Sequence, residues 1–235
     1  MTTYNVRVGR SDSAEGPLTD YFGKAEKDTT NNFPILTAPY RFENHPGWAG
    51  TAHCGVFTDG QGNYFMAHQG RLSPQNQLMV LHVRQLFFTP DGWPVVSPER
   101  YAGTPPREFT EADLVGEWEI IRVQEPKYER QLEAGQILWG EGELKDGEWN
   151  LSTRVNLAKN GTCAGEMTDD EWKNVQMNGN WSFLTEKQLL MIESDKEIIE
   201  NLIIFAGHDW ENETENILLT GLDSRGRSVW GKRIK

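Results

Sequence analysis

The sequence predicts an all-β protein. Nine Trp, ten Phe and six Tyr occur with 23 Gly and 11 Pro in 235 residues, a mixture that is typical of short strands joined by tight turns. Short segments in which polar and apolar residues alternate recur along the chain, bounded by Gly, Asn or Asp. Two prolines within 103–107 interrupt this pattern and favour extended backbone, so we expect two β-rich domains, residues 1–105 and 111–235.

The first domain is expected to contain strands at 4–8, 52–58, 63–68 and 78–88. Asp-Gly-Gln-Gly at 59–62 separates the second strand from the third and is a strong hairpin signal. The last strand is apolar on both faces and runs into the turn Asp91-Gly92-Trp93. A hairpin, a further strand and such a turn make up most of one β-propeller blade, and neighbouring blades bury both faces of its sheet.

The second domain begins its strand pattern at Gly116–Val123, the first of seven or eight short segments. The others are expected near 137–144, 148–157, 177–184, 187–193, 197–206, 214–222 and 227–234. Antiparallel strands in this number form an up-and-down barrel, which closes its own edges. The opening Gly116-x-Trp118 resembles the first strand of lipocalin-like barrels.

Charge and composition exclude some partners. The formal net charge of −12 repels polyanions, so we expect no nucleic acid partner. No stretch approaches the roughly 18 apolar residues of a membrane span, and the first residues lack the apolar core of a signal peptide, so we expect no membrane partner. Cys54 and Cys163 fall in different predicted domains and fit no zinc spacing, which predicts neither a disulfide between them nor a zinc site.

Three stretches of the first domain, Tyr4–Pro17, Gly50–Arg71 and Leu81–Gly103, resemble the C-terminal part of family 43 glycoside hydrolases, the arabinanases in particular. The resemblance covers almost half of the chain. It implies the last blades of a five-bladed, sugar-cleaving β-propeller, which in some arabinanases precedes a β-barrel. The expected fold is therefore a partial β-propeller followed by an antiparallel, lipocalin-like β-barrel.

The resemblance also implies an inverting hydrolysis of α-1,5-linked arabinofuranosyl chains by an Asp base, a Glu acid and a second Asp. Inverting glycosidases need two carboxyl groups, one on each side of the bond that breaks. In the family these carboxylates lie mostly or wholly before the segment that resembles Tyr4–Ser11. We therefore assign no catalytic residue in this chain.

His53 is the candidate metal ligand. It lies in Ala52–Phe57, which resembles the Gly-His-x-x-Val-Phe stretch of arabinanases, in which the His reaches the propeller axis and helps to hold calcium, directly or through water. Calcium takes roughly six to eight mostly oxygen ligands, so water and carbonyl groups would have to complete the site. The alternative is a buried His that is hydrogen-bonded between two strands.

Gln69, Arg71 and Trp48 are the candidate substrate-binding residues. His68–Arg71 resembles the Tyr-His-x-x-Arg region near the substrate end of the family's channel, and a guanidinium offers donors that suit sugar hydroxyls. The alternative for Arg71 is a solvated loop charge. Trp48 is predicted to stack on a pentose ring or, alternatively, to pack beneath its loop. His82 and Arg84 share one face of a strand, which favours a core role.

The favoured function is that of a component of an arabinan-degrading enzyme, with arabinan or a related pentose polysaccharide as substrate. Completing the ring requires a partner, either the N-terminal half of the propeller or a second copy of the chain, so we expect no lone monomer. The complete enzyme would be extracellular or periplasmic by resemblance. Two alternatives stay open: a non-catalytic carbohydrate-binding or assembly module, and a lipocalin-like binder of small ligands for which residues 1–105 are a platform.

Overall fold

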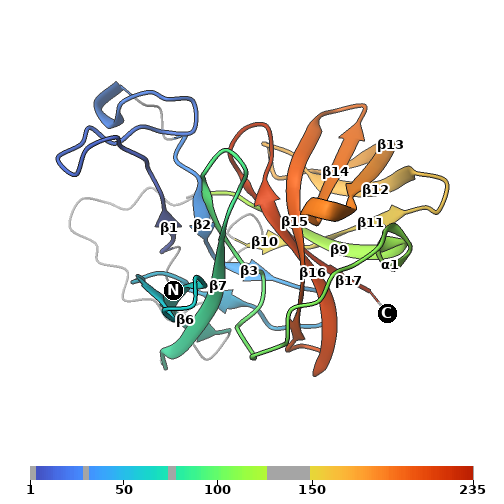
Figure 1. Cartoon of the computed structure of the whole chain (residues 1–235), viewed down its shortest axis with the longest axis horizontal. Helices are drawn as coiled ribbons and strands as arrows, with labels where there is room; N and C mark the ends of the chain where they lie inside the picture. The colour runs from blue at the N-terminus through green and yellow to red at the C-terminus, as the bar shows by residue number, and fades with distance from the viewer. Residues whose placement is uncertain (1–3, 29–31, 74–77, 126–148, 235) are drawn as a thin grey trace.

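The computed structural model describes residues 4–28, 32–73, 78–125 and 149–234 (Figure 1). Strands dominate these residues, and the helices among them are three single turns, η1 (Glu26–Asp28), α1 (Glu111–Leu114) and η2 (Thr185–Lys187). None of these helices is long or apolar enough to cross a membrane. The all-β prediction is confirmed, and Figure 1 shows the first half of the chain beside a barrel that the second half forms.

The first half forms two sheets. A small one pairs β1 (Val6–Arg7) antiparallel with β2 (Ile35–Thr37). The larger one contains β3 (Tyr40–Arg41), β4 (Trp48–Ala49), β5 (Gly55–Thr58), β6 (Tyr64–Leu72), β7 (Val80–Phe88) and β8 (Pro94–Val96). Strands β5 to β8 form an antiparallel meander. A four-stranded meander is the unit of a propeller blade, although a complete propeller stays a prediction.

Side-chain hydrogen bonds close the two turns that the sequence predicts in this meander. Between β5 and β6, Asp59 Oδ1 accepts from the backbone N–H groups of Gln61 at 2.8 Å and Asn63 at 3.1 Å. Between β7 and β8, Thr89 Oγ1 accepts from the N–H of Trp93 at 3.0 Å, and the Trp93 ring is buried. Asp59 and Thr89 therefore stabilise these turns, because their short side chains accept hydrogen bonds from nearby backbone N–H groups as a backbone carbonyl group would.

The second half forms a closed antiparallel barrel, with strands in the order β11-β12-β13-β14-β15-β16-β17-β9. Its strands are β9 (Gly116–Val123), β11 (Thr153–Leu157), β12 (Thr162–Thr168), β13 (Asn174–Leu184), β14 (Leu189–Ser194), β15 (Ile198–Asp209), β16 (Thr214–Leu222) and β17 (Ser228–Arg233). The predicted barrel is confirmed. Closure leaves its strands without a free edge.

In the second half, the structure differs from the strand predictions at two places. Strand β12 has no counterpart among the predicted strands, because its inward positions include Gly165 between Cys163 and Met167 and so break the apolar alternation. The range 148–157 divides into two strands. Its first part, β10 (Asn150–Leu151), pairs in parallel with β3 and so joins the larger sheet of the first half. The strand predicted at 137–144 lies outside the described residues.

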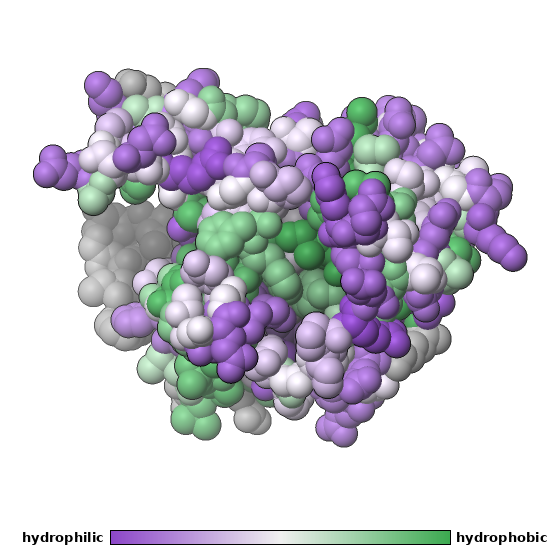
Figure 2. Space-filling view, in the orientation of Figure 1, coloured by the Kyte–Doolittle hydropathy of each residue, from purple (hydrophilic) through white to green (hydrophobic). Residues whose placement is uncertain are grey.

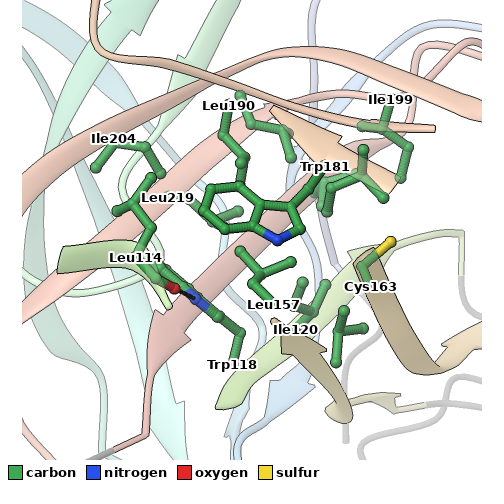
Figure 3. Close-up of a cluster of buried hydrophobic side chains, with 14 of the residues drawn as sticks. Leu114, Trp118, Ile120, Leu157, Cys163, Trp181, Leu190, Ile199, Ile204 and Leu219 are labelled. Carbon is green, nitrogen blue, oxygen red and sulfur yellow. Dashed lines mark hydrogen bonds between the residues drawn. The ribbon is translucent and has the colours of Figure 1, made fainter. Parts of the chain in front are cut away.

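Apolar side chains fill the inside of the barrel (Figure 3). They include Leu114, Trp118, Ile120, Leu157, Cys163, Trp181, Leu190, Ile199, Ile204 and Leu219. The indole N–H of Trp118 donates to the carbonyl oxygen of Leu114 in α1 at 2.9 Å, so both ring and helix are fixed at one end of the core. Two indole rings occupy space that a ligand-binding barrel would leave open.

The outer face of the barrel packs against the first half. Ile121 and Val123 of β9 and Trp230 of β17 point away from the barrel core, into a second cluster that contains Tyr40 and Met66. Strand β9 is thus buried on both faces over residues 118–123, where the charged Glu119 and Arg122 are buried together with the apolar residues. Replacing a fully buried Trp by Ala costs about 3–5 kcal/mol, so Trp230 alone is expected to contribute a stabilisation of that order.

Candidate functional site

Gln69 and Arg71 lie together near the end of β6. Side chains two residues apart on a strand share a face, and both are half-buried. The Gln69 amide nitrogen lies 3.5 Å from the carbonyl oxygen of Gly50, and the Gln69 backbone N–H donates to Ala52 at 3.0 Å. This strand end therefore lies beside the segment that leads to His53.

His53 is exposed and lies directly before β5. Its backbone has a left-handed φ of 58°, a conformation in which His is one of the more frequent residues other than Gly. The alternative of a buried His between two strands is therefore wrong. Among the described residues, no group of three or more metal-ligand side chains includes His53. One imidazole is too few ligands for calcium, and the metal role stays a prediction.

Trp48 lies on the other side of the sheet from Arg71. In the register of β4 and β6, Trp48 pairs with Leu72 while Ala49 pairs with Arg71, so Trp48 and Arg71 point to opposite faces. Trp48 is only 6% exposed, and its ring stacks on His45 at 5.8 Å between centroids. Its environment agrees with the packing alternative. The structure thus does not bring the three predicted substrate-binding residues onto one surface, and their binding roles stay predictions.

Arg84 organises a buried polar group between the sheet and the barrel. Its Nε donates to His68 Nε2 at 2.9 Å, its Nη1 to the carbonyl oxygen of Ser97 at 2.8 Å, and its Nη2 to the Tyr40 hydroxyl at 2.7 Å. Burial, and then the Arg84 charge, lower the pKa of His68 to about 3. Burial raises the pKa of Tyr40 to about 12. The neutral His accepts the guanidinium hydrogen bond, and this is the core role that the sequence favours.

His82 is buried beside this group, as its shared strand face with Arg84 predicts. Its ring meets the edge of Trp48 at 4.4 Å and lies 5.0 Å from the ring of His68. Burial, followed by the Arg84 charge, lowers its pKa to about 2. His82 is therefore a neutral, packed side chain and not a general acid or base.

A cluster of buried charges, Lys232 with Glu99, Asp209 and Glu211, joins the first half to the barrel. Lys232 Nζ lies 2.7 Å from Glu211 Oε2, 3.0 Å from Asp209 Oδ1 and 3.4 Å from Glu99 Oε1. The four side chains are at most 7% exposed. Glu99 follows β8, Asp209 ends β15 and Lys232 belongs to β17, so three distant segments meet here.

The charges in this cluster change one another's proton affinity. Burial, and then the neighbouring Glu211, raise the pKa of Glu99 well above its ordinary value. Burial acts to lower the pKa of Lys232, yet the three carboxylates raise it, so the ammonium stays charged. Burial likewise opposes ionisation of Asp209, but hydrogen bonds from Asn212 and Lys232 lower its pKa. Glu99 is therefore the carboxyl group of the cluster that most readily holds a proton.

The same cluster is the one place among the described residues where three metal-ligand side chains come together. The ligand atoms of Glu99, Asp209 and Glu211 lie within 4.8 Å of one another. The Lys232 ammonium contacts all three, so it supplies the positive charge that a cation would bring. The arrangement is a buried ion-pair cluster and not a metal centre.

Sequence reasoning did not find this cluster. The partners Glu99 and Lys232 are 133 residues apart, and nothing local marks either as buried. The one available signal is that Lys232 alternates with the apolar Trp230 on a strand whose outer face is covered.

An open apolar face covers the meander on the side that does not contact the barrel. Large apolar side chains exposed on the meander and beside it are Val56, Phe57, Tyr64, Leu78, Met79, Val80, Leu81, Phe88 and Tyr101. The strand registers place Phe57 and Leu81 on the open face, and Val56, Tyr64, Val80 and Phe88 on the face of Met66 and His82. Leu81 is 70% exposed while its neighbour His82 points into the core, so Leu81 faces away from the barrel. Figure 2 shows apolar side chains gathered over the lower ends of β6 and β7. Exposed patches of this kind mark interaction sites.

Comparison with protein-family models finds a match to the second half of the chain. Residues 98–231 match a family model described as a C-terminal lipocalin-like domain, GH43_C. The match covers more than half of the chain and includes most of the barrel.

Known relatives align with nearly all of the chain. Extracellular endo-α-(1→5)-L-arabinanase 2 of Bacillus subtilis is 24% identical, over 98% of this chain and 46% of the relative. The extracellular endo-α-(1→5)-L-arabinanase of Thermotoga petrophila is 24% identical, over 99% of this chain and 47% of its own length. The crystal structure of endo-1,5-α-L-arabinanase from Thermotoga petrophila RKU-1 superposes with a TM-score of 0.78 at 21% identity, over 99% of this chain and 49% of that chain. The chain spans about half the length of these relatives and aligns with their C-terminal half.

Proposed function

This chain belongs to the family of C-terminal lipocalin-like domains of family 43 glycoside hydrolases, and we propose that it is one component of an arabinan-degrading enzyme. The proposed reaction is the inverting hydrolysis of α-1,5-linked arabinofuranosyl chains. The substrate is arabinan or a related pentose polysaccharide. By analogy with relatives named as extracellular enzymes, we propose an extracellular or periplasmic location for the complete enzyme.

The observation that carries the proposal is the alignment of nearly the whole chain with half of two arabinanases. The chemistry needs an acid and a base, since one carboxyl group protonates the leaving oxygen and another activates water. We assign both groups to the half of the enzyme that has no counterpart among these 235 residues. The chain would then contribute the far wall of the cleft and the barrel that supports it.

The open apolar face supports a partner. The opposite face of the same sheet is buried by Tyr40, Trp230 and their neighbours. The sheet therefore carries apolar side chains on both faces, as sheets that are covered on both sides do. We propose that the N-terminal half of the enzyme covers the exposed face through an apolar sheet of its own. A second copy of this chain is the competing occupant.

The sequence-predicted side chains have proposed roles in the completed cleft. Gln69 and Arg71 would bind sugar hydroxyls as donors, because their shared strand face lies next to the open surface. His53 would contribute one calcium ligand, directly or through water, with the remaining ligands from water, carbonyl groups and the other half. Trp48 would act from behind this surface, by packing against His45 and His82.

The two other functions have different support. A small-ligand barrel is disfavoured, because apolar side chains that include Trp118 and Trp181 fill the interior. A non-catalytic carbohydrate-binding module stays a second candidate, since the described residues contain a polar crevice on the barrel that is suited to hydroxyl groups.

Co-expression with the N-terminal half of the Bacillus subtilis arabinanase tests the proposal. We expect the two chains to co-purify and the complex to release reducing ends from linear 1,5-arabinan. Leu81→Glu should abolish co-purification, whereas Ile198→Glu, an equally apolar but barrel-side exposed position, should leave it intact. Light scattering that finds this chain monomeric in the presence of the N-terminal half, together with no arabinan cleavage by the mixture, would refute both the proposed association and the proposed arabinan-degrading function.

A further inference from the structure

A polar crevice lies between the outer wall of the barrel and the loop of residues 41–45. It consists of two adjoining cavities, of about 700 Å³ and about 240 Å³, that share Glu43, Asn44, Glu119 and Arg154 in their walls. Ligand pockets typically measure roughly 300–1,000 Å³. The crevice is thus large enough for several sugar units, and it is separate from Gln69, Arg71 and His53.

Three adjacent strands present a row of alternating charges to this crevice. Arg154 of β11 and Lys232 of β17 both pair with Glu119 of β9 in the strand registers, one on each side. Neighbouring strands are about 4.8 Å apart, so the Arg154 guanidinium and the Glu119 carboxylate follow one another at that spacing, while the Lys232 ammonium turns into the buried cluster with Glu99, Asp209 and Glu211. Glu43 continues the row, because its carboxylate pairs with the Arg154 guanidinium.

Glu119 is the fixed centre of the row. It is 6% exposed and yet contributes to the walls of both cavities. Its Oε1 accepts hydrogen bonds from the backbone N–H of Glu43 and from the Ser152 hydroxyl, which hold the carboxyl group in place. Burial raises its pKa, and these two hydrogen bonds oppose the shift. A buried, oriented carboxyl group in a cleft is a feature of ligand sites.

We propose that this crevice binds a neutral oligosaccharide. A sugar hydroxyl both donates and accepts, so successive hydroxyls can meet Arg154, Glu119 and Asn44 without leaving a charge unmatched. An anionic chain would meet the Glu43 and Glu119 carboxylates, and a cationic one the Arg154 guanidinium, which lies about one strand spacing from Glu119. The alternating signs therefore select a ligand without net charge.

The site would hold the polymer on the barrel while cleavage takes place elsewhere. A second contact on the same chain raises the effective concentration of the substrate at the cleft. The choice of a pentose chain as ligand rests on the proposed function. Binding itself needs no catalytic carboxylate and can be measured with the isolated chain.

Calorimetric titration of the chain with arabinohexaose tests the site, together with NMR shifts of the Ser152 and Thr153 amides. We expect saturable binding that moves these amides. Arg154→Ala and Glu119→Gln should each weaken the affinity about tenfold, the effect of one lost charge-assisted hydrogen bond. Lys196→Ala is the matched control, because Lys196 also forms an exposed ion pair, with Asp195, but does not contribute to the walls of the crevice.

The outcomes separate this site from the proposed enzyme. Absence of binding, equal affinity in Arg154→Ala and Lys196→Ala, or tighter binding of oligogalacturonate than of arabinohexaose would each overturn the proposal. Binding of xylohexaose as tightly as arabinohexaose would support a neutral-sugar site of broad specificity. Retained binding with no cleavage by the reconstituted enzyme would refute the enzymatic proposal and leave the crevice site standing.

Discussion

Replacing Lys232 by Met should remove a large part of the stability of the protein. Lys232 Nζ contacts three carboxylate groups at 2.7–3.4 Å, and all four side chains are at most 7% exposed. Met keeps the length of the side chain and its contact with the apolar surroundings but leaves the acids unpaired. Removing one partner of a buried ion pair costs about 3–5 kcal/mol, out of a typical total of about 5–15 kcal/mol.

Urea unfolding followed by Trp fluorescence measures this loss. With an m-value of about 2 kcal/mol per M, the expected cost lowers the midpoint by roughly 1.5–2.5 M. Lys196→Met is the control, since an ion pair as exposed as that of Lys196 with Asp195 contributes about 0–1 kcal/mol. If Lys232→Met does not fold, adding Asp209→Asn should restore part of the folded protein by removing one unpaired charge, because the pKa of Asp209 is lowered and this carboxylate stays ionised. Equal midpoints for the two single variants would refute the reasoning.

Three further predictions concern single side chains. Because burial raises the pKa of Glu99 above its ordinary 4.5, its stabilising effect is complete below pH 4.5 and is lost as the pH rises through the folded-state pKa. Glu99→Gln should therefore flatten this part of the stability curve, and an unchanged slope would contradict the assignment. His53→Ala should weaken calcium binding to the complex with the N-terminal half while the far-ultraviolet spectrum stays the same; calorimetry with unchanged affinity would remove the metal role. Cys54 is exposed, whereas burial raises the pKa of the Cys163 thiol, so a thiol reagent should label Cys54 rapidly and Cys163 only after unfolding. Two rapidly labelled thiols would show that the barrel core is open.

Local patterns were sufficient to predict the longer strands of the meander and most strands of the barrel, but not the short strands β2, β3, β4 and β8. The hairpin at 59–62 and the barrel strands at 214–222 and 227–234 follow from alternation and turn residues, which act within a few positions of each other. Strand β12 was not predicted, because Gly165 occupies an inward position, where a Cβ would lie 2.2 Å from the carbonyl oxygen of Arg154. The close approach of the Arg154 backbone requires Gly at position 165. A Gly at this inward position interrupts the alternation of apolar and polar residues from which a strand is predicted.

Contacts between the halves were not predictable from local sequence. Nothing near Asn150 indicates that it pairs with Tyr40 in the other sheet, because the pairing depends on how the barrel lies against the first half. The same holds for Glu99 and Lys232. For Trp48 the sequence did not indicate which face of the sheet its side chain occupies. A shift of one residue in the strand register would move it from the core to the open surface.

The rate of linear 1,5-arabinan hydrolysis, measured for this chain alone, for the N-terminal half alone and for the two together, tests the central claim most directly. General acid–base steps contribute about 10² to 10⁴ in rate each, so a chain without the acid and the base should show no cleavage above background. The mixture should cleave arabinan, and Arg71→Ala should reduce its rate. Efficient cleavage by residues 1–235 alone would contradict the account, because it would require catalytic carboxylates within this chain.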